Sequence, residues 1–236
     1  MKIGVVLALG LLLFGAAEEA SSQRTGSRVG RDAQSGNVED AELALSMMAQ
    51  CVAARRGALV RRWLATLPGS EEERQLLNRQ VEDLSLCMES NKLVLDGMEL
   101  AFKPRSLRRP VALAMVERRL PQVSVQAPVA PGTEPWFVPR LANVTAATPL
   151  DRASLVLQDF GHCVALSAWQ DVRSLFAAKL ESAEEAAAVR RLTPALGPCL
   201  SDGVTINITR KNMRLILAEP FYHLSTISPP RARTGK

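Results

Sequence analysis

The sequence predicts a mainly helical protein built from two tandem copies of one cysteine-containing unit. The first reason is an internal repeat: a shift of 112 residues places Cys51 on Cys163 and Cys87 on Cys199, and it matches 14 of the 45 residues in 43–87 without a gap. The second reason is that apolar residues recur at helical spacing through most of each copy. A separate observation concerns location: the apolar N-terminal stretch indicates export from the cytoplasm.

Residues 1–22 are interpreted as a signal peptide. Lys2 is followed by an apolar run from Ile3 to Ala17. In a helix this run extends about 22 Å, which is shorter than the ~30 Å apolar core of a bilayer. Cleavage is expected after Ala17 or after Ser22. An uncleaved membrane anchor is the alternative interpretation, and no other segment of the sequence is long and apolar enough to span a membrane.

The first unit is expected over residues 41–120, after a flexible lead-in over 23–40. Its first three helices each carry an apolar face, and the third begins at Ser70, which forms a capping box with Glu73. Apolar residues then alternate behind Gly97, which predicts a short strand before a final helix. The predicted order is therefore helix, helix, helix, strand, helix.

The second unit, residues 151–226, repeats this order. Ser182 and Glu185 repeat the capping box, and the final helix is expected to begin at Asn212. The alternating residues are Met98, Leu100 and Phe102 in the first copy and Val204, Ile206 and Ile208 in the second. Because a lone strand leaves its edges unpaired, the favoured arrangement is a small two-stranded sheet that joins the copies into one pseudo-symmetric body. Two separate helical units are the alternative.

A proline-rich linker, residues 121–150, separates the units. It contains six of the 14 prolines and is expected to be extended. Trp136 and Phe137 are unusual in such a linker. They are interpreted either as a recognition element for a partner or as anchors that hold the linker against a helical face. Residues 227–236 are expected to be a disordered basic tail.

The four cysteines are expected to form disulfides, because an exported protein meets an oxidising compartment. Four cysteines allow three pairings. A unit that was copied whole carries its own bridge, so the repeat predicts Cys51–Cys87 and Cys163–Cys199. In the loop-entropy model each bridge of this span contributes about 4 kcal/mol to stability.

Three features of the sequence are distinctive: the run from Leu64 to Glu73, the flanking cysteine pairs, and Gly203 with the later run from Met213 to Tyr222. In these features both copies resemble a group of uncharacterised exported proteins of alphaproteobacteria. Those proteins carry one or more copies of a cysteine-paired helical unit. The resemblance implies this fold and an exported location, and it implies no activity or ligand. The first copy departs from the pattern at its end, where Glu117-Arg118-Arg119 replaces His223-Leu224-Ser225.

Little in the sequence predicts catalysis. His162 and His223 have no metal-ligand spacing, and no nucleophile, phosphate-binding or dinucleotide-binding motif is present. The paired carboxylates Glu72 and Glu73 are best explained by helix capping. We therefore expect no metal and no cofactor. Aromatic residues are only 4% of the chain, which argues against nucleic-acid binding, whereas the net charge of +5 is compatible with an anionic surface.

The sequence therefore predicts a non-enzymatic interaction or structural protein of the cell envelope, periplasmic or secreted. Its expected partner is an envelope protein or peptide, or an anionic surface. The candidate contact residues are Trp136, Phe137, Arg105, Arg108 and Arg109. The three arginines lie near the start of a predicted helix, where positive charge opposes the helix dipole. The alternative is an envelope-modifying hydrolytic enzyme whose site is assembled from scattered residues such as His162, Asp159 and Asp171.

Overall fold

A computed structural model describes residues 38–80, 84, 86–87, 104–128, 132–145 and 147–227. The described part is mainly helical, as the sequence predicts, and it contains no β-strand. The predicted signal peptide, most of the lead-in and of the tail, and the first predicted strand at Met98–Phe102 lie outside the described residues. The described helices are α1 (Val38–Arg55), α2 (Gly57–Leu64), α3 (Glu71–Arg79), η1 (Pro104–Leu107), α6 (Arg108–Arg119), η2 (Leu120–Gln122), α7 (Val138–Leu141), α8 (Arg152–Ser167), α9 (Trp169–Ala177), α10 (Ala183–Leu196), η3 (Gly197–Cys199) and α11 (Arg210–Thr226).

The helices of the N-terminal half begin and end where their sequence dictates. Helix α2 buries Trp63 and Leu64 together with Leu59 and Val60, while Arg61 and its neighbour Arg62 stay exposed. Helix α3 begins after Ser70, whose side chain accepts a hydrogen bond from the Glu73 amide at 3.1 Å. The predicted cap at Ser70 is confirmed, but the return bond of a capping box is not formed, because the Glu73 carboxylate accepts from the Gly69 amide instead of the Ser70 amide.

The C-terminal half has a similar succession of helices. Helix α10 begins after Ser182, whose side chain accepts from the Glu185 amide at 3.2 Å, so this predicted cap is also confirmed. The return bond of a capping box is again absent, because the Glu185 carboxylate accepts from the Glu181 amide. The start of α11 differs from the expectation. Thr209 caps this helix, and Asn212 lies one turn inside it, where its side chain accepts from the Thr209 amide. The two residues form a reciprocal capping box, so the cap lies three residues earlier than predicted.

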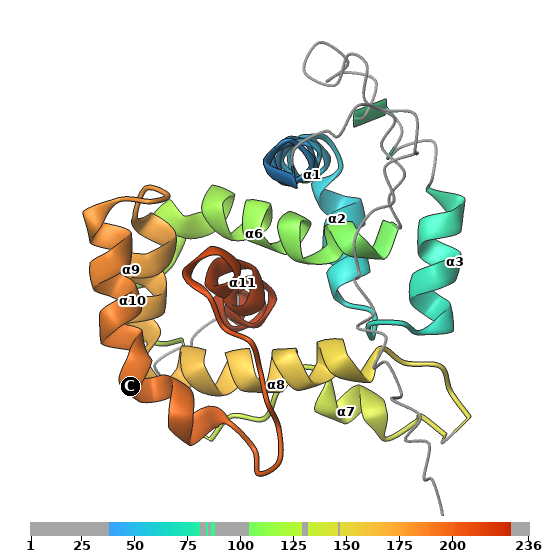
Figure 1. Cartoon of the computed structure of the whole chain (residues 1–236). Helices are drawn as coiled ribbons and strands as arrows, with labels where there is room; N and C mark the ends of the chain where they lie inside the picture. Colours follow the sequence, from blue (N-terminus) through green and yellow to red (C-terminus); the bar gives the residue numbers. More distant parts are fainter. Residues whose placement is uncertain are drawn as a thin grey trace, which may run out of the picture.

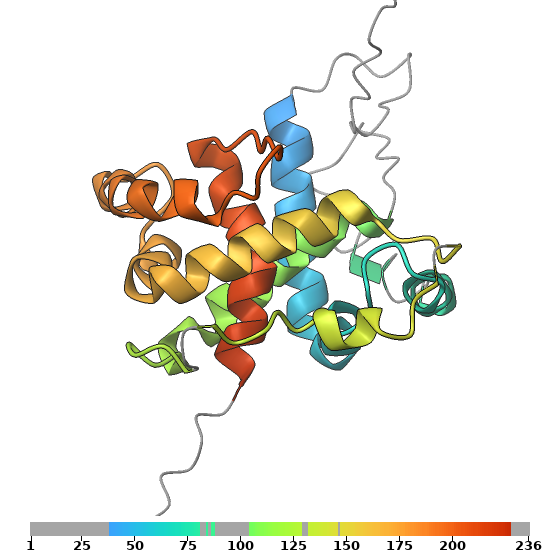
Figure 2. The ribbon, with the colours of Figure 1, turned by 90° about the horizontal axis from the view of Figure 1, so that it is seen from below.

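Helix α11 is the centre of the molecule, enclosed by α6, α8 and α9 (Figure 1). It packs most extensively on α6, from the N-terminal half, and on α8. Figure 2 shows α8 crossing α11, and Gly161 of α8 makes this close crossing possible. A β-carbon on Gly161 would lie 2.7 Å from the Pro220 Cγ and 3.1 Å from the Ile216 carbonyl oxygen of α11.

Both halves contribute to one continuous apolar core. Fully buried Trp63, Leu107 and Val111 belong to the same cluster as Leu217 and Phe221 of α11. The halves therefore join through helix packing. Residues 204–208 keep the predicted alternation, because Val204, Ile206 and Ile208 are half-buried while the residues between them are exposed. This alternation indicates extended backbone, but the segment is not assigned as a strand, so the two-stranded sheet is not present among the described residues.

Candidate functional site

Two disulfides hold the helices of each half together. Cys51 of α1 is bonded to Cys87, with the α-carbons 5.7 Å apart. Cys163 of α8 is bonded to Cys199 of η3, with the α-carbons 5.6 Å apart. The predicted within-copy pairing is confirmed.

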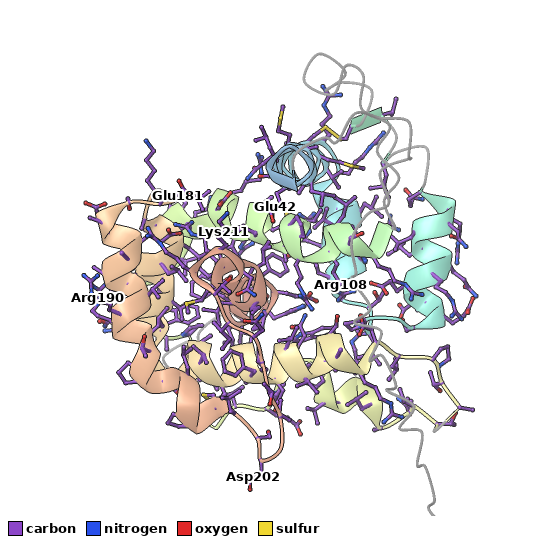
Figure 3. The ribbon with its side chains drawn as sticks, in the orientation of Figure 1. Glu42, Arg108, Glu181, Arg190, Asp202 and Lys211 are labelled. Carbon is purple, nitrogen blue, oxygen red and sulfur yellow. A yellow bond between two sulfur atoms is a disulfide. The ribbon has the colours of Figure 1, made fainter. Side chains whose placement is uncertain are left out.

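Arg108 is the centre of a buried ion cluster between the halves. It lies at the start of α6 beside α11 (Figure 3) and is only 5% exposed. Its Nε lies 3.0 Å from both carboxylate oxygens of Glu219 of α11, and its Nη1 donates to the Glu73 Oε1 at 2.7 Å. Its Nη2 also donates to the backbone carbonyls of Leu64 and Thr66, at 3.1 and 2.8 Å. One guanidinium thus joins α11 to the α2–α3 turn.

The electrostatics of this cluster follow from its burial. Desolvation would raise the pKa of Glu219, but the charge of Arg108, the nearby His223 and the hydrogen bonds from Arg108 outweigh it and lower the pKa to about 2. Desolvation likewise opposes the charge on Arg108, and the two carboxylates more than compensate, so the pKa of Arg108 is raised. Glu219 and Arg108 are therefore both ionised at neutral pH.

Glu73 has further contacts that explain why a carboxylate is buried there. It accepts from the Trp63 Nε1 at 3.0 Å and from the Gly69 amide at 2.7 Å. Its own amide donates to Ser70. Sequence reasoning assigned Glu73 to helix capping only, and the structure adds the buried ion pair with Arg108.

A second cluster in the C-terminal half contains the equivalent groups. Glu185 is 2% exposed and accepts from the Arg214 Nε of α11 at 2.7 Å. It also accepts from the Glu181 amide at 2.9 Å and from the Arg210 Nε at 2.9 Å. Burial alone would raise the pKa of Glu185, but the hydrogen bonds from Arg214, the Glu181 amide and Arg210 lower it. The Arg214 Nη2 donates to the carbonyl of Ala178, the position that the 112-residue shift matches to Thr66.

The three predicted contact arginines therefore lie in different environments. Arg108 is buried and fully engaged within the chain, so the folded surface does not offer it to a partner. Arg105 is exposed, with its Nε 3.7 Å from the Glu73 Oε2, and Arg109 is half-buried. The sequence could not reveal the role of Arg108, because its second carboxylate is 111 residues away.

Trp136 and Phe137 hold the linker against the helices. The Trp136 ring stacks on the His223 ring of α11 with 4.1 Å between centroids, and its Nε1 donates to the Gln158 Oε1 at 3.3 Å. Phe137 is 5% exposed and packs edge-to-face on Trp136. These contacts fit the anchoring interpretation. His223 completes the region, with its Nε2 3.1 Å from the Leu64 carbonyl oxygen and 3.9 Å from the Glu219 Oε1.

The residues proposed for a hydrolytic site lie in separate surroundings. His162 is 6% exposed, and its Nε2 is 2.7 Å from the Thr133 carbonyl oxygen in the linker. Asp171 forms an ion pair with Arg191 at 2.6 Å. Asp159 is exposed on α8 and has no ion pair among the described residues.

Asp159 belongs instead to an apolar groove with a volume of about 250 Å³. The groove lies between α8, η3, the extended segment after η3, and the linker at Phe137. Two of its lining residues are large exposed apolar side chains, Val156 at 41% and Leu200 at 37% exposure. The described residues that line it are Phe137, Leu155, Val156, Asp159, Phe160, Cys199, Leu200, Ser201, Val204 and Ile206. The sequence signal for it was weak: only the alternation from Val204 to Ile208 pointed to this region.

No cluster of three or more His, Cys, Asp or Glu side chains within the described residues could hold a metal ion. None of the described helices is long and apolar enough to cross a membrane.

Comparison of the chain with models of protein families, with curated proteins and with solved structures finds no match.

Proposed function

We propose that the chain is an exported, non-enzymatic interaction protein of the cell envelope, and that the apolar groove beside α8 is its binding site. The observation that carries this proposal is the groove itself, because exposed Val156 and Leu200 adjoin a hollow lined by apolar side chains. Exposed apolar surface that borders a hollow is typical of partner-binding sites.

The proposal includes a duplicated architecture. Ser70, Glu73 and Arg108 make the same contacts as Ser182, Glu185 and Arg214. The two N-terminal caps and the two glutamates are separated by the 112 residues of the sequence repeat, and a buried arginine of the following long helix meets each glutamate. These matches support two copies of one unit that pack around a common core.

The proposed location rests on the disulfides and on the N-terminal stretch. Each bridge closes a loop within its own half of the chain, and none of the described cysteines is free. Disulfides that stabilise a small helical body persist in oxidising compartments.

A photocrosslinking amino acid at position 156 tests the proposal in intact bacteria that express the full chain. We expect a discrete adduct in the envelope fraction. The matched control places the same amino acid at position 190 in α10, which is exposed on the outside of the molecule (Figure 3) and is not part of the groove. The adduct at position 156 should disappear when Leu200→Asp is added, with the circular dichroism spectrum unchanged. Equal adducts at both positions, or a protein retained in the cytoplasm with free thiols, would contradict the proposal.

A further inference from the structure

The extended segment 204–208 at the groove has backbone groups that the fold does not use. Its first N–H donates to the carbonyl of Ser201, and the Asn212 side chain donates to the carbonyl of Asn207 at 2.9 Å. The other N–H groups and carbonyls of the segment have no hydrogen-bond partner among the residues that the structure describes. An extended segment in this state is a template for pairing with another extended chain.

The side chains of this segment are arranged as in a half-covered strand. Val204 and Ile206 line the groove, whereas Thr205 and Asn207 are exposed. A chain that pairs with the backbone here would place alternate side chains over the groove, since successive side chains of a strand point to opposite faces. The groove would therefore contact every second side chain of the bound chain.

The size of the hollow selects among possible occupants. Its volume of about 250 Å³ is below the range of roughly 300–1,000 Å³ that is typical of small-molecule sites. Its walls include Phe137, Phe160 and Leu155, and the disulfide of Cys199 lies at its edge. One large apolar side chain of a bound peptide suits this space better than a whole cofactor or metabolite.

Charge adds a second requirement. Asp159 is the only charged residue among the described residues that line the groove. Its carboxylate is exposed and has no hydrogen-bond or ion-pair partner among the described residues. A cation on the ligand, next to its apolar side chain, would meet this carboxylate at the rim.

We propose that the groove binds an extended polypeptide segment by strand addition to residues 204–208. An apolar side chain of the segment enters the groove, and a neighbouring Lys or Arg pairs with Asp159. This inference rests on the proposed function and specifies the class of its ligand.

Random peptides displayed on phage, selected on the oxidised chain without residues 1–22, test the inference. We expect the selected peptides to share a basic residue close to a large apolar residue.

Synthetic copies of a selected peptide, N-methylated at alternate amides, should show the pairing directly. Neighbouring N–H groups of a strand point to opposite edges, so one alternate set of methyl groups should weaken binding about tenfold or more and the other set should not.

Protein variants distinguish the proposed binding site from the proposed strand addition at that site. Asp159→Lys should weaken binding of the basic peptide about tenfold and favour a peptide with Glu in place of the basic residue. Peptides that lose binding on Leu200→Asp but are indifferent to N-methylation and to Asp159→Lys would overturn strand addition and leave the binding function standing. If no selected peptide depends on Leu200, both proposals are wrong.

Discussion

The two buried ion clusters are built from the same parts but join different regions of the molecule. Each has a serine cap, a glutamate of the capped helix and an arginine of a long helix. In the second cluster Arg214 and Arg210 both come from α11 and pair with Glu185 of α10, so this cluster joins two helices of the same half. In the first, Arg108 holds Glu73 of its own half and Glu219 of the other half. The arginine of the first cluster therefore joins the two halves, whereas the arginines of the second contact a glutamate of their own half.

The clusters also differ in the exposure of the arginines next to each carboxylate. Glu185 and Glu73 each lie near an exposed arginine, Arg210 at 42% and Arg105 at 44% exposure, whereas Glu219 is paired with Arg108, whose side chain is 6% exposed. A Glu219 carboxylate that loses Arg108 therefore has little solvent to replace it. Substitutions at matched positions should therefore have unequal effects, and these differences provide tests of the comparison.

The largest difference is expected between Arg108→Ala and Arg214→Ala. Arg108→Ala leaves two buried carboxylates without their guanidinium, and we expect a loss of about 4 kcal/mol in the free energy of unfolding. Arg214→Ala should cost about 2 kcal/mol, because Glu185 keeps Arg210 as a partner. Urea unfolding of the oxidised protein at neutral pH measures both. Equal losses would show that the halves do not depend on Arg108 in particular.

The acid sensitivity of the first cluster gives the next effect. The pKa of Glu219 is about 2 in the folded protein, against an ordinary value of 4.5. A lowered folded pKa means that the stabilisation is complete above the unfolded value and is lost as the pH falls through the folded value. As the pH falls from 4.5 to about 2, the protein should lose the stabilisation that ionised Glu219 provides, on the order of 3 kcal/mol in the free energy of unfolding.

The matched variant for this prediction is Glu219→Gln. It should be less stable than the natural protein at neutral pH, and its urea midpoint should fall less steeply as the pH is lowered from above 4.5 to about 2. Identical slopes for the two proteins would exclude Glu219 as a source of the acid sensitivity.

The turns before the two capped helices should respond in opposite ways to substitution. Gly69 has φ of +80°, and a β-carbon there would lie 2.3 Å from the Asp151 amide nitrogen. Gly69→Ala should therefore cost about 2 kcal/mol or more, through strain and displacement of α8. Glu181, the matched position, has φ of +61° and is exposed, so Glu181→Gly should stabilise by about 1 kcal/mol. Thermal unfolding of both variants checks the signs, and a tolerated Gly69→Ala would contradict the close contact.

The smallest effects should be equal in the two halves. Ser70→Ala and Ser182→Ala each remove one side-chain acceptor from the amide three residues on. Each should cost about 1 kcal/mol. Because these caps do not touch the other half, a marked inequality in urea unfolding would show that the clusters differ in more than the partners of Arg108.

Local signals in the sequence predicted much of this fold. The caps at Ser70 and Ser182 depend on residues three positions apart, so the sequence displays them directly. The disulfide pairs followed from the repeat. Asn212 was misplaced as a cap because Thr209 and Asn212 both suit that position, and only the backbone shows which residue stands outside the helix.

The features that the sequence did not predict depend on contacts between distant residues. Arg108 was a candidate for partner binding because its positive charge is unfavourable at the start of a helix. The structure supplies the compensating carboxylates, one 35 and one 111 residues away. The groove was missed for the same reason, since its walls come from the linker, α8 and the segment after η3. The role of Arg108 has no local pattern, and the groove has one only in the alternation from Val204 to Ile208.

Cutting the linker tests most directly whether Arg108 joins two units into one body. A protease site inserted after Asn143, which is exposed, allows the oxidised protein to be cleaved between its halves. We predict that the cleaved halves elute together at the size of the uncut protein, and that they separate or unfold when Arg108→Ala is present. Two halves that elute separately as stable folded particles, with Arg108 intact, would contradict this account.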